Sequence, residues 1–120
     1  MIIKRTVVKD SFYSEILKML SSINPLSKLR PRELELLAEL MKQNDLNRDL
    51  DKVKRRIYIF STENRKNIRE ILNCSSDALN NNLSILRKHK LLNSNNELLS
   101  ILDVDSTKGF DFNLKINCND

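Results

Sequence analysis

The chain has 120 residues, of which 40% are hydrophobic and 31% charged, with one glycine, no tryptophan and a net charge of +5. This length permits one domain with a modest core, and the composition is typical of a helix-rich globular protein and excludes a largely disordered chain. No apolar run reaches the roughly 18 residues of a membrane span, and Lys4 and Arg5 interrupt the apolar start, so we expect a soluble, cytoplasmic protein without a secretory signal.

The residues that usually carry catalysis or hold cofactors are few. Cys74 and Cys118 lack the spacing of a metal site, and His89 is the single histidine. Gly109 is the single glycine, whereas phosphate-binding loops need several. We therefore expect a protein that is not an enzyme and that has no metal, no cofactor and no identifiable small-molecule ligand.

The N-terminal part predicts a strand and a helix. Residues 2–8 (IIKRTVV) are β-prone and predict a short strand or an arm. From Ser11 to Ile23, apolar residues recur at helical spacing, and Asn24 and Pro25 end the pattern. The apolar face of this helix is formed by Phe12, Ile16, Met19, Leu20 and Ile23. It either packs on the core or contacts a partner chain, so residues 1–28 are predicted as an arm and a possible dimerisation element.

The segment LRPRELELLAELMK predicts a helix that begins near Pro31. Glu33 and Glu35 fall in its first turn, where the helix dipole favours negative charge. Its apolar face is formed by Leu34, Leu37, Ala38 and Met41. The next run, NRDLDKVKRRIYIF, predicts another helix, although RIYIF also suits a strand. The apolar face of that helix would be formed by Leu50, Val53, Ile57 and Phe60.

The next predicted helix ends at Asn73, and Asn73, Cys74 and Ser75 form a tight turn after it. Ser61 or Thr62 can cap this helix, whose inner face would be Ile68, Ile71 and Leu72. Asn73 lies where a left-handed residue commonly ends a helix. Cys74 is expected to turn inward as a small apolar side chain.

A second helix follows the turn, from about Ser76 to Lys90, with Ser75 or Ser76 as its cap. It buries Leu79, Leu83 and Leu86, and Asp77 adds favourable charge to its first turn. Its opposite side is polar and consists of Asp77, Asn81, Ser84 and Lys88, with Asn80 and Arg87 on a flank.

Two β features are predicted after this helix. The run LLNSNNELLSIL suggests a strand, a turn and a strand, with Ser94, Asn95 and Asn96 supplying the bend. In GFDFNLKI, residues 109–116, apolar and polar residues alternate as in a half-buried strand.

The order of helix, tight turn, polar helix and hairpin resembles the winged helix-turn-helix superfamily. The stretch NIREILNCSSDALNNNLSILRKHKLL, residues 67–92, looks like that family's second helix, turn and recognition helix, and Leu91 and Leu92 would enter the wing. LRPRELELLAEL is similar to the opening of LuxR-type DNA-binding domains. Those domains lack a wing and lack the roughly 20 residues that lie here between the first helix and the helix-turn-helix pair, so a winged domain of another lineage is favoured. The resemblance implies a mainly α fold with a small β-hairpin wing (α+β), as one winged helix-turn-helix domain over residues 29–120.

The resemblance implies a non-enzymatic, sequence-specific double-stranded DNA-binding protein in transcription regulation or replication control, and it is compatible with a homodimer. The helix from Ser76 would enter the major groove, and Asn80, Asn81 and Ser84 would contact bases. The predicted backbone contacts are Lys54, Arg55, Arg56, Arg65, Lys66, Arg69, Arg87, Lys88 and Lys90. The Asn, Lys and Ile usage suits an AT-rich bacterial, plasmid or phage genome.

Charge supports the DNA interpretation without deciding it. Residues 52–69 hold seven cations and one carboxylate, a net charge of +6, which would suit phosphate contacts or a solvated helix face. Asn80, Asn81 and Asn82 are weak helix formers, so they indicate either a use for amide side chains or drift in an Asn-rich proteome. The alternative is a structural or protein-interaction module with a winged-helix fold, for example a phage virion or assembly component.

Overall fold

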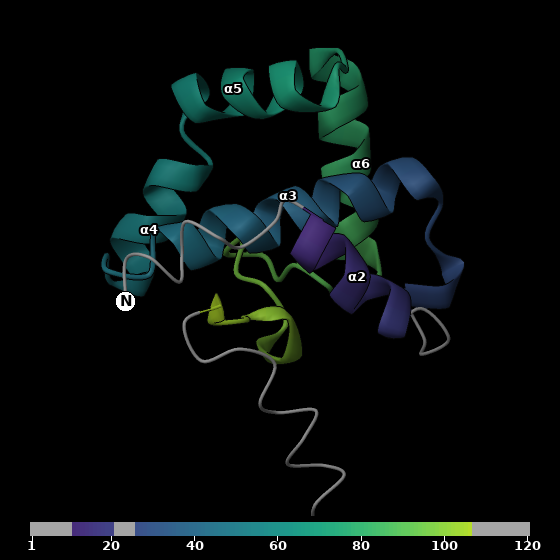
Figure 1. Cartoon of the computed structure of the whole chain (residues 1–120). Helices are drawn as coiled ribbons and strands as arrows, with labels where there is room; N and C mark the ends of the chain where they lie inside the picture. The colour runs from purple at the N-terminus through teal and green to yellow at the C-terminus, as the bar shows by residue number, and fades with distance from the viewer. Residues whose placement is uncertain (1–10, 21–25, 107–120) are drawn as a thin grey trace, which may run out of the picture.

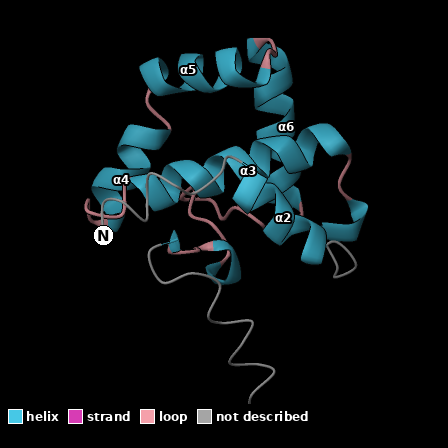
Figure 2. Cartoon of the chain, viewed as in Figure 1, coloured by secondary structure: helices cyan, strands magenta, loops and turns pink. Residues whose placement is uncertain are grey.

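The computed structural model describes residues 11–20 and 26–106, and all regular elements within these ranges are helices (Figure 2). The α-helices are α2 (Ser11–Met19), α3 (Pro31–Leu46), α4 (Lys52–Ile59), α5 (Thr62–Leu72) and α6 (Ser76–Lys88). Short 3-10 helices are η1 (Leu26–Lys28) and η2 (Ser100–Leu102). The strands expected over residues 2–8 and 109–116, and the helical residues expected after Leu20, lie outside the described ranges.

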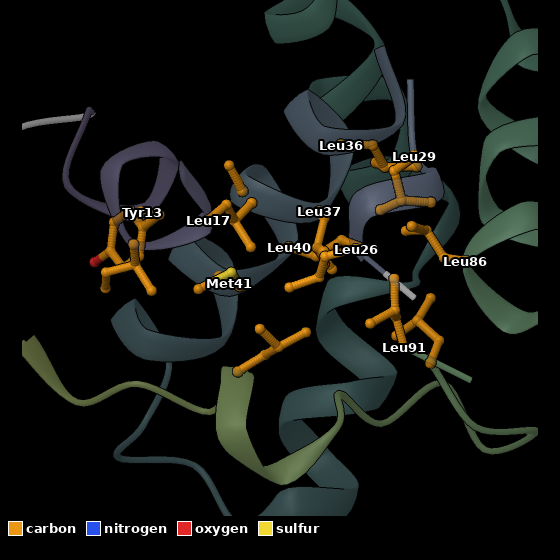
Figure 3. Close-up of a cluster of buried hydrophobic side chains, with 14 of the residues drawn as sticks. Tyr13, Leu17, Leu26, Leu29, Leu36, Leu37, Leu40, Met41, Leu86 and Leu91 are labelled. Carbon is orange, nitrogen blue, oxygen red and sulfur yellow. The ribbon is translucent and has the colours of Figure 1, made fainter. Parts of the chain in front are cut away.

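Helix α3 is the centre of the fold and contacts α2, α4, α5 and α6 (Figure 1). Its Leu36, Leu37, Leu40 and Met41 are almost completely buried, because their spacing of one, three and one places them on the same half of the helix. Figure 3 shows leucines of neighbouring segments packed around them, including Leu17, Leu26, Leu86 and Leu91. The predicted mainly α core is confirmed.

The start of α3 is fixed by the side chain of Glu33. Pro31 occupies its first turn, as predicted, and Glu33 reaches back to accept a 2.8 Å hydrogen bond from the backbone N–H of Arg30. The Arg30 guanidinium donates to the same carboxylate at 2.8 and 3.0 Å. Burial would raise the pKa of Glu33, but the hydrogen bonds and charge of Arg30 outweigh it and hold that pKa below its ordinary value.

Helix α2 packs on α3 within the same chain. Tyr13, Ile16, Leu17 and Leu20 are buried in the common core. Met19, predicted on the apolar face, is instead 56% exposed, because Tyr13 and Leu17 occupy the inward positions. The division of the chain at residue 28 and a dimerisation role for this segment stay predictions.

Helix α4 is rotated relative to the prediction. Val53 and Ile57 are 54% and 62% exposed, and the inward pair is Arg55 and Ile59. The Arg55 guanidinium donates to the backbone carbonyls of Arg48 and Leu50 in the loop between α3 and α4, so this rotation gives these carbonyls a donor that an apolar side chain could not supply. Residues 56–60 (RIYIF) do not form the alternative strand; they are the last turn of α4 and its C-cap residue Phe60. On α5, Ile68 is buried as predicted, whereas Ile71 is 49% exposed.

The predicted β-hairpin wing is wrong for the described residues. Residues 91–99 turn back at Asn96, which has φ 61°, but the two arms share a single antiparallel bridge, Leu92 to Leu98. The chain then coils into η2, which buries Leu102 completely. In a wing, residues 98–102 (LLSIL) would be extended and paired with a single strand, and an isolated two-stranded hairpin has only marginal stability. The 3-10 turn instead places Leu102 in the core, where its burial stabilises the fold.

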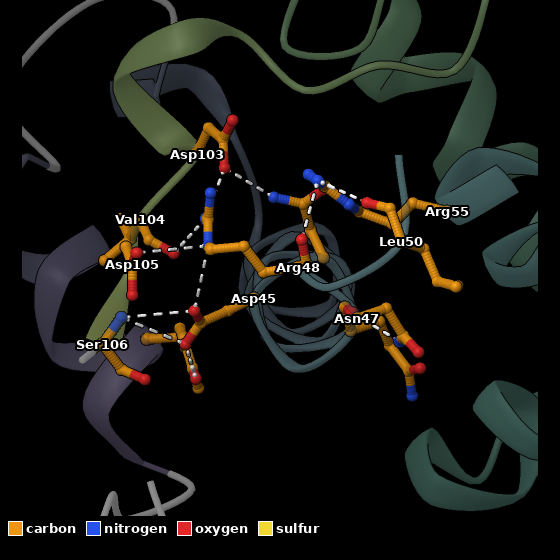
Figure 4. Close-up of polar contacts among 12 residues, drawn as sticks. Asp45, Asn47, Arg48, Leu50, Arg55, Asp103, Val104, Asp105 and Ser106 are labelled. Atoms are coloured by element: carbon orange, nitrogen blue, oxygen red, sulfur yellow. Dashed lines mark hydrogen bonds and ion pairs between the residues drawn. The ribbon is translucent and has the colours of Figure 1, made fainter. Parts of the chain in front are cut away.

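A polar cluster ties the end of α3 to residues 103–106 (Figure 4). Asp45 is fully buried, accepts a 2.6 Å hydrogen bond from the Tyr13 hydroxyl and also accepts from the backbone N–H of Ser106. Arg48 lies among Asp45, Asp103 and Asp105. Burial alone would lower the Arg48 pKa, but these carboxylates, Asp103 foremost, raise it above its ordinary value, so the guanidinium stays charged.

Candidate nucleic-acid interface

Helices α5 and α6 form a helix-turn-helix pair at one edge of the molecule. Figure 1 shows α5 running across the upper edge and α6 descending from its end toward α3. Leu79, Leu83 and Leu86 hold α6 on the core, as predicted, and Ile68 does the same for α5. The remaining faces of both helices are available to solvent.

The turn between these helices has the geometry that the sequence predicts. Asn73 is left-handed, with φ 53° and ψ 54°, and its N–H donates to the Glu70 carbonyl. The N–H of Cys74 donates to the Arg69 carbonyl at 3.0 Å, which completes a Schellman motif. Cys74 is half-buried and packs against the core. This motif sets the direction in which α6 leaves α5.

One serine caps each of the two helices: Ser61 caps α5 and Ser75 caps α6. Ser61 Oγ accepts from the N–H of Asn64 at the start of α5, and Ser75 Oγ accepts from the N–H of Ala78 at the start of α6. Helix α6 ends at Lys88, two residues before the predicted end, because Lys90 is left-handed with φ 64° and the N–H of Leu91 donates to the Leu86 carbonyl.

The polar face of α6 is open to solvent. Asn80, Asn81, Ser84 and Lys88 are all exposed, and α2 packs on α3 instead of covering them. Among the described residues, the side chains of Asn81 and Ser84 have no hydrogen-bond partner, so their polar groups are available to a ligand.

Asn80 differs from these two because it is held by α5. The Arg65 guanidinium donates a hydrogen bond to the Asn80 amide oxygen. This contact orients the amide and leaves its NH₂ group as the free donor. Of the predicted residues, Arg65 and Asn80 are therefore brought together directly, with Arg65 holding Asn80 in place.

Cations also flank the turn. Lys66 and Arg69 line a surface hollow with Asn73, Cys74 and Ser75. Arg32 of α3, which the sequence reasoning missed, donates to the Asn73 carbonyl at 3.4 Å and pairs with Glu35 at 3.3 Å. The only sequence signal for Arg32 is its place beside Pro31, which indicates a helix start and gives no sign of the distant turn.

At the other end of α6, the predicted cations divide into two groups. The Arg87 guanidinium donates two hydrogen bonds, of 3.0 and 2.8 Å, to the amide oxygen of Asn96 in the following turn. Lys88 and Lys90 are exposed. Arg87 thus joins α6 to residues 91–98, while Lys88 and Lys90 can meet an anion.

The cations of α4 do not lie with the α6 face. Figure 1 shows α4 and α6 toward opposite ends of α3. Lys54 is exposed there and Arg56 lines a cavity. Arg55 is buried, and its guanidinium donates to Asn44 Oδ1 at 3.1 Å and to the Leu50 carbonyl at 3.0 Å (Figure 4). A phosphate contact by Arg55 would break these hydrogen bonds. Arg55 is therefore a core residue, and its predicted role as a DNA backbone contact is wrong.

Within the described ranges, no three His, Cys, Asp or Glu side chains gather in a way that could hold a metal ion. His89 follows the last turn of α6 and is half-buried. None of the helices in this part of the chain combines the length and the apolar character needed to cross a membrane.

No protein-family model, curated protein or solved structure matches this chain. The function proposed below therefore rests on the exposed side chains of α5, α6 and the turn between them.

Proposed function

We propose that the protein binds double-stranded DNA sequence-specifically, with α6 in the major groove, and acts in transcription regulation or replication control. The observation that carries this function is the solvent-exposed polar face of α6, on which Asn81 and Ser84 have no partner among the described residues. A helix of this kind fits the major groove, which is about 12 Å wide. We further propose that it acts in the cytoplasm of a bacterial or phage-infected cell.

Base contacts are assigned to Asn80, Asn81 and Ser84. An asparagine amide can donate to N7 and accept from the N6 amino group of adenine in a paired arrangement. Asn81 has both amide groups free for this contact, while Asn80 shares its oxygen with Arg65 and keeps its NH₂ group free to donate. Adenine-containing steps are therefore the preferred target of this surface.

Backbone contacts are assigned to the cations that flank the α6 face. Lys66 and Arg69 lie beside the turn, and Lys88 and Lys90 lie at the far end of α6. Phosphate contacts of this kind fix the orientation of α6 without reading sequence. The described residues contain no strand pair to act as a wing, so the contacts assigned here are those of the helices and their turns.

A fluorescence-anisotropy titration with duplex DNA at several salt concentrations tests this function. With about four phosphate contacts, the logarithm of the binding constant should fall with the logarithm of salt concentration with a slope of about −4. The duplex should be selected from a random pool, and a scrambled duplex serves as the control. Binding no tighter than about 10 µM at low salt would contradict the proposal.

A second candidate function, contact with another protein or a second copy of this chain, is favoured by α4. Val53, Ile57 and Tyr58 are each about half exposed on this helix, whereas α2 has most of its apolar face on α3. If α4 mediates a homodimer, Val53→Ser with Ile57→Ser should convert a dimer to a monomer in sedimentation experiments. A wild-type monomer at high concentration would exclude the homodimer.

A further inference from the structure

A cavity of about 140 Å³ lies between α4 and the segment that follows α6. Its apolar wall is formed by Leu40 of α3, Ile59 and Phe60 at the end of α4, and Leu92 and Leu98, the two residues of the β-bridge. Leu40, Ile59 and Leu92 are almost completely buried, so this wall is part of the core and is preformed.

The size of the cavity indicates the size of its occupant. An engineered apolar cavity of about 150 Å³ in another protein accepts a benzene molecule. The cavity here can therefore take one six-membered ring or a branched aliphatic group of similar volume. It is too small for a nucleotide, because pockets for ligands of drug size measure about 300 Å³ or more.

The charged residues around the cavity are unequally engaged. Asp103 accepts hydrogen bonds from Arg48 and Asn44, and Glu97 accepts one from Asn93. The side chains of Lys52 and Arg56, in contrast, make no ion pair or hydrogen bond with other residues in the described ranges. Glu97 keeps its negative charge because Asn93 is neutral, but the two unpaired cations outnumber it, so the charges left to meet an occupant are predominantly positive.

We propose that this cavity binds a small carboxylate with a ring-sized apolar body. The apolar body lies against Ile59, Leu92 and Leu98, and the carboxylate is held by Lys52 and Arg56 at the α4 side of the cavity. Charge-assisted hydrogen bonds from these two cations fix the orientation of the ligand. The site is separate from the polar face of α6 and does not depend on DNA binding.

Benzoate titration of the full-length protein, followed by ¹H–¹⁵N NMR, tests this site without any variant. We expect saturable shifts of the backbone amides of Ile59, Phe60, Leu92 and Leu98, with a dissociation constant on the order of 1 mM or tighter for so small a ligand. Benzyl alcohol and benzylamine, which have the same ring and no carboxylate, should bind about tenfold more weakly. No shifts of these amides at about 10 mM benzoate, or equal binding of benzylamine, would overturn the proposal.

Variants separate the charge contribution from the apolar contribution. Lys52→Gln with Arg56→Gln should weaken benzoate binding about tenfold, whereas Lys54→Gln, on the same helix but outside the cavity lining, should leave it unchanged. Leu98→Phe should fill the cavity and abolish binding, with thermal unfolding measured to establish that the variant is folded. Equal weakening by Lys54→Gln and by the double variant would show a non-specific charge effect and contradict the site.

Discussion

The Arg48 guanidinium donates a 2.6 Å hydrogen bond to the Asp103 carboxylate, across 55 residues of sequence. The same nitrogen donates to the Val104 carbonyl at 2.7 Å. Because both side chains are about three-quarters buried, this pair holds the segment after η2 against the end of α3 more firmly than a surface ion pair would.

Replacing Arg48 should destabilise the fold. Arg48→Met removes the cation that pairs with Asp45, Asp103 and Asp105, and we expect the free energy of unfolding in urea to fall by about 2–3 kcal/mol. Arg32→Met is the control, because its ion pair with Glu35 is more than half exposed and should contribute less than about 1 kcal/mol. Equal losses of unfolding free energy in the two variants would show that the burial of Arg48 adds nothing to the stability of the fold.

Glu33 should make the stability depend on pH in acid. Its pKa in the folded chain is lower than the ordinary value of 4.5, so its stabilising effect is complete above pH 4.5 and is lost as the pH falls through the folded pKa. Glu33→Gln should be less stable than the wild type at neutral pH, and the difference should shrink below pH 4.5. Urea unfolding at several pH values measures this, and a pH-independent difference would contradict it.

The left-handed turn should tolerate glycine better than alanine at residue 73. Asn73→Ala keeps a Cβ atom at φ 53° but loses the short polar side chain that makes this conformation accessible to asparagine, and it should lower the free energy of unfolding by about 1 kcal/mol. Asn73→Gly removes the Cβ atom and should change it by less than about 0.5 kcal/mol. Asn67→Ala, on the exposed face of α5, is a control that should not destabilise, since alanine favours helix. Chemical denaturation of the three variants decides the order.

Base reading and phosphate contact should separate under substitution. Asn81→Ala with Ser84→Ala should reduce the ratio of affinities for selected and scrambled duplexes about tenfold. Lys66→Ala with Arg69→Ala should instead weaken binding to both duplexes and make the salt slope shallower by about 2. Lys54→Ala, on α4, should change both the affinity ratio and the salt slope less than these variants do. Anisotropy titrations give both quantities, and a uniform loss in the first variant would remove Asn81 and Ser84 from base reading.

Arg55 should matter for folding. Arg55→Ala removes donors from the carbonyl of Leu50 and the amide oxygen of Asn44, and should lower the free energy of unfolding by about 2–4 kcal/mol. Its neighbour Lys54 is exposed, so Lys54→Ala should leave stability unchanged within about 0.5 kcal/mol. A stable Arg55→Ala variant with weakened DNA binding would reverse this assignment.

Local patterns predicted α5, α6 and the turn between them well. The left-handed Asn73, the inward Cys74 and the buried Leu79, Leu83 and Leu86 each depend on residues within one or two turns, and all are found. The same holds for Pro31 at the start of α3. Such features are determined by neighbours in sequence, so a single chain is sufficient to predict them.

Features that depend on partners outside the helix itself were missed. The burial of Arg55 follows from its hydrogen bonds to Asn44 of α3 and to the Leu50 carbonyl in the loop before α4, and the loss of the wing follows from a core position that Leu102 fills. The contact of Arg32 with the carbonyl of Asn73 joins residues 41 apart in sequence. Helical periodicity carries no information on these partners, so it oriented Val53 and Ile57 toward the core when they lie outside it.

The central position of α3 has a consequence for how the molecule opens. Since α2, α4, α5 and α6 all pack on this helix, the amides of Leu37 and Met41 should exchange with deuterium only when the whole chain unfolds. Loss of α3 would leave α5 and α6 with few contacts except those with each other and with α4. The polar face of α6 therefore persists or disappears together with the domain, as one cooperative unit.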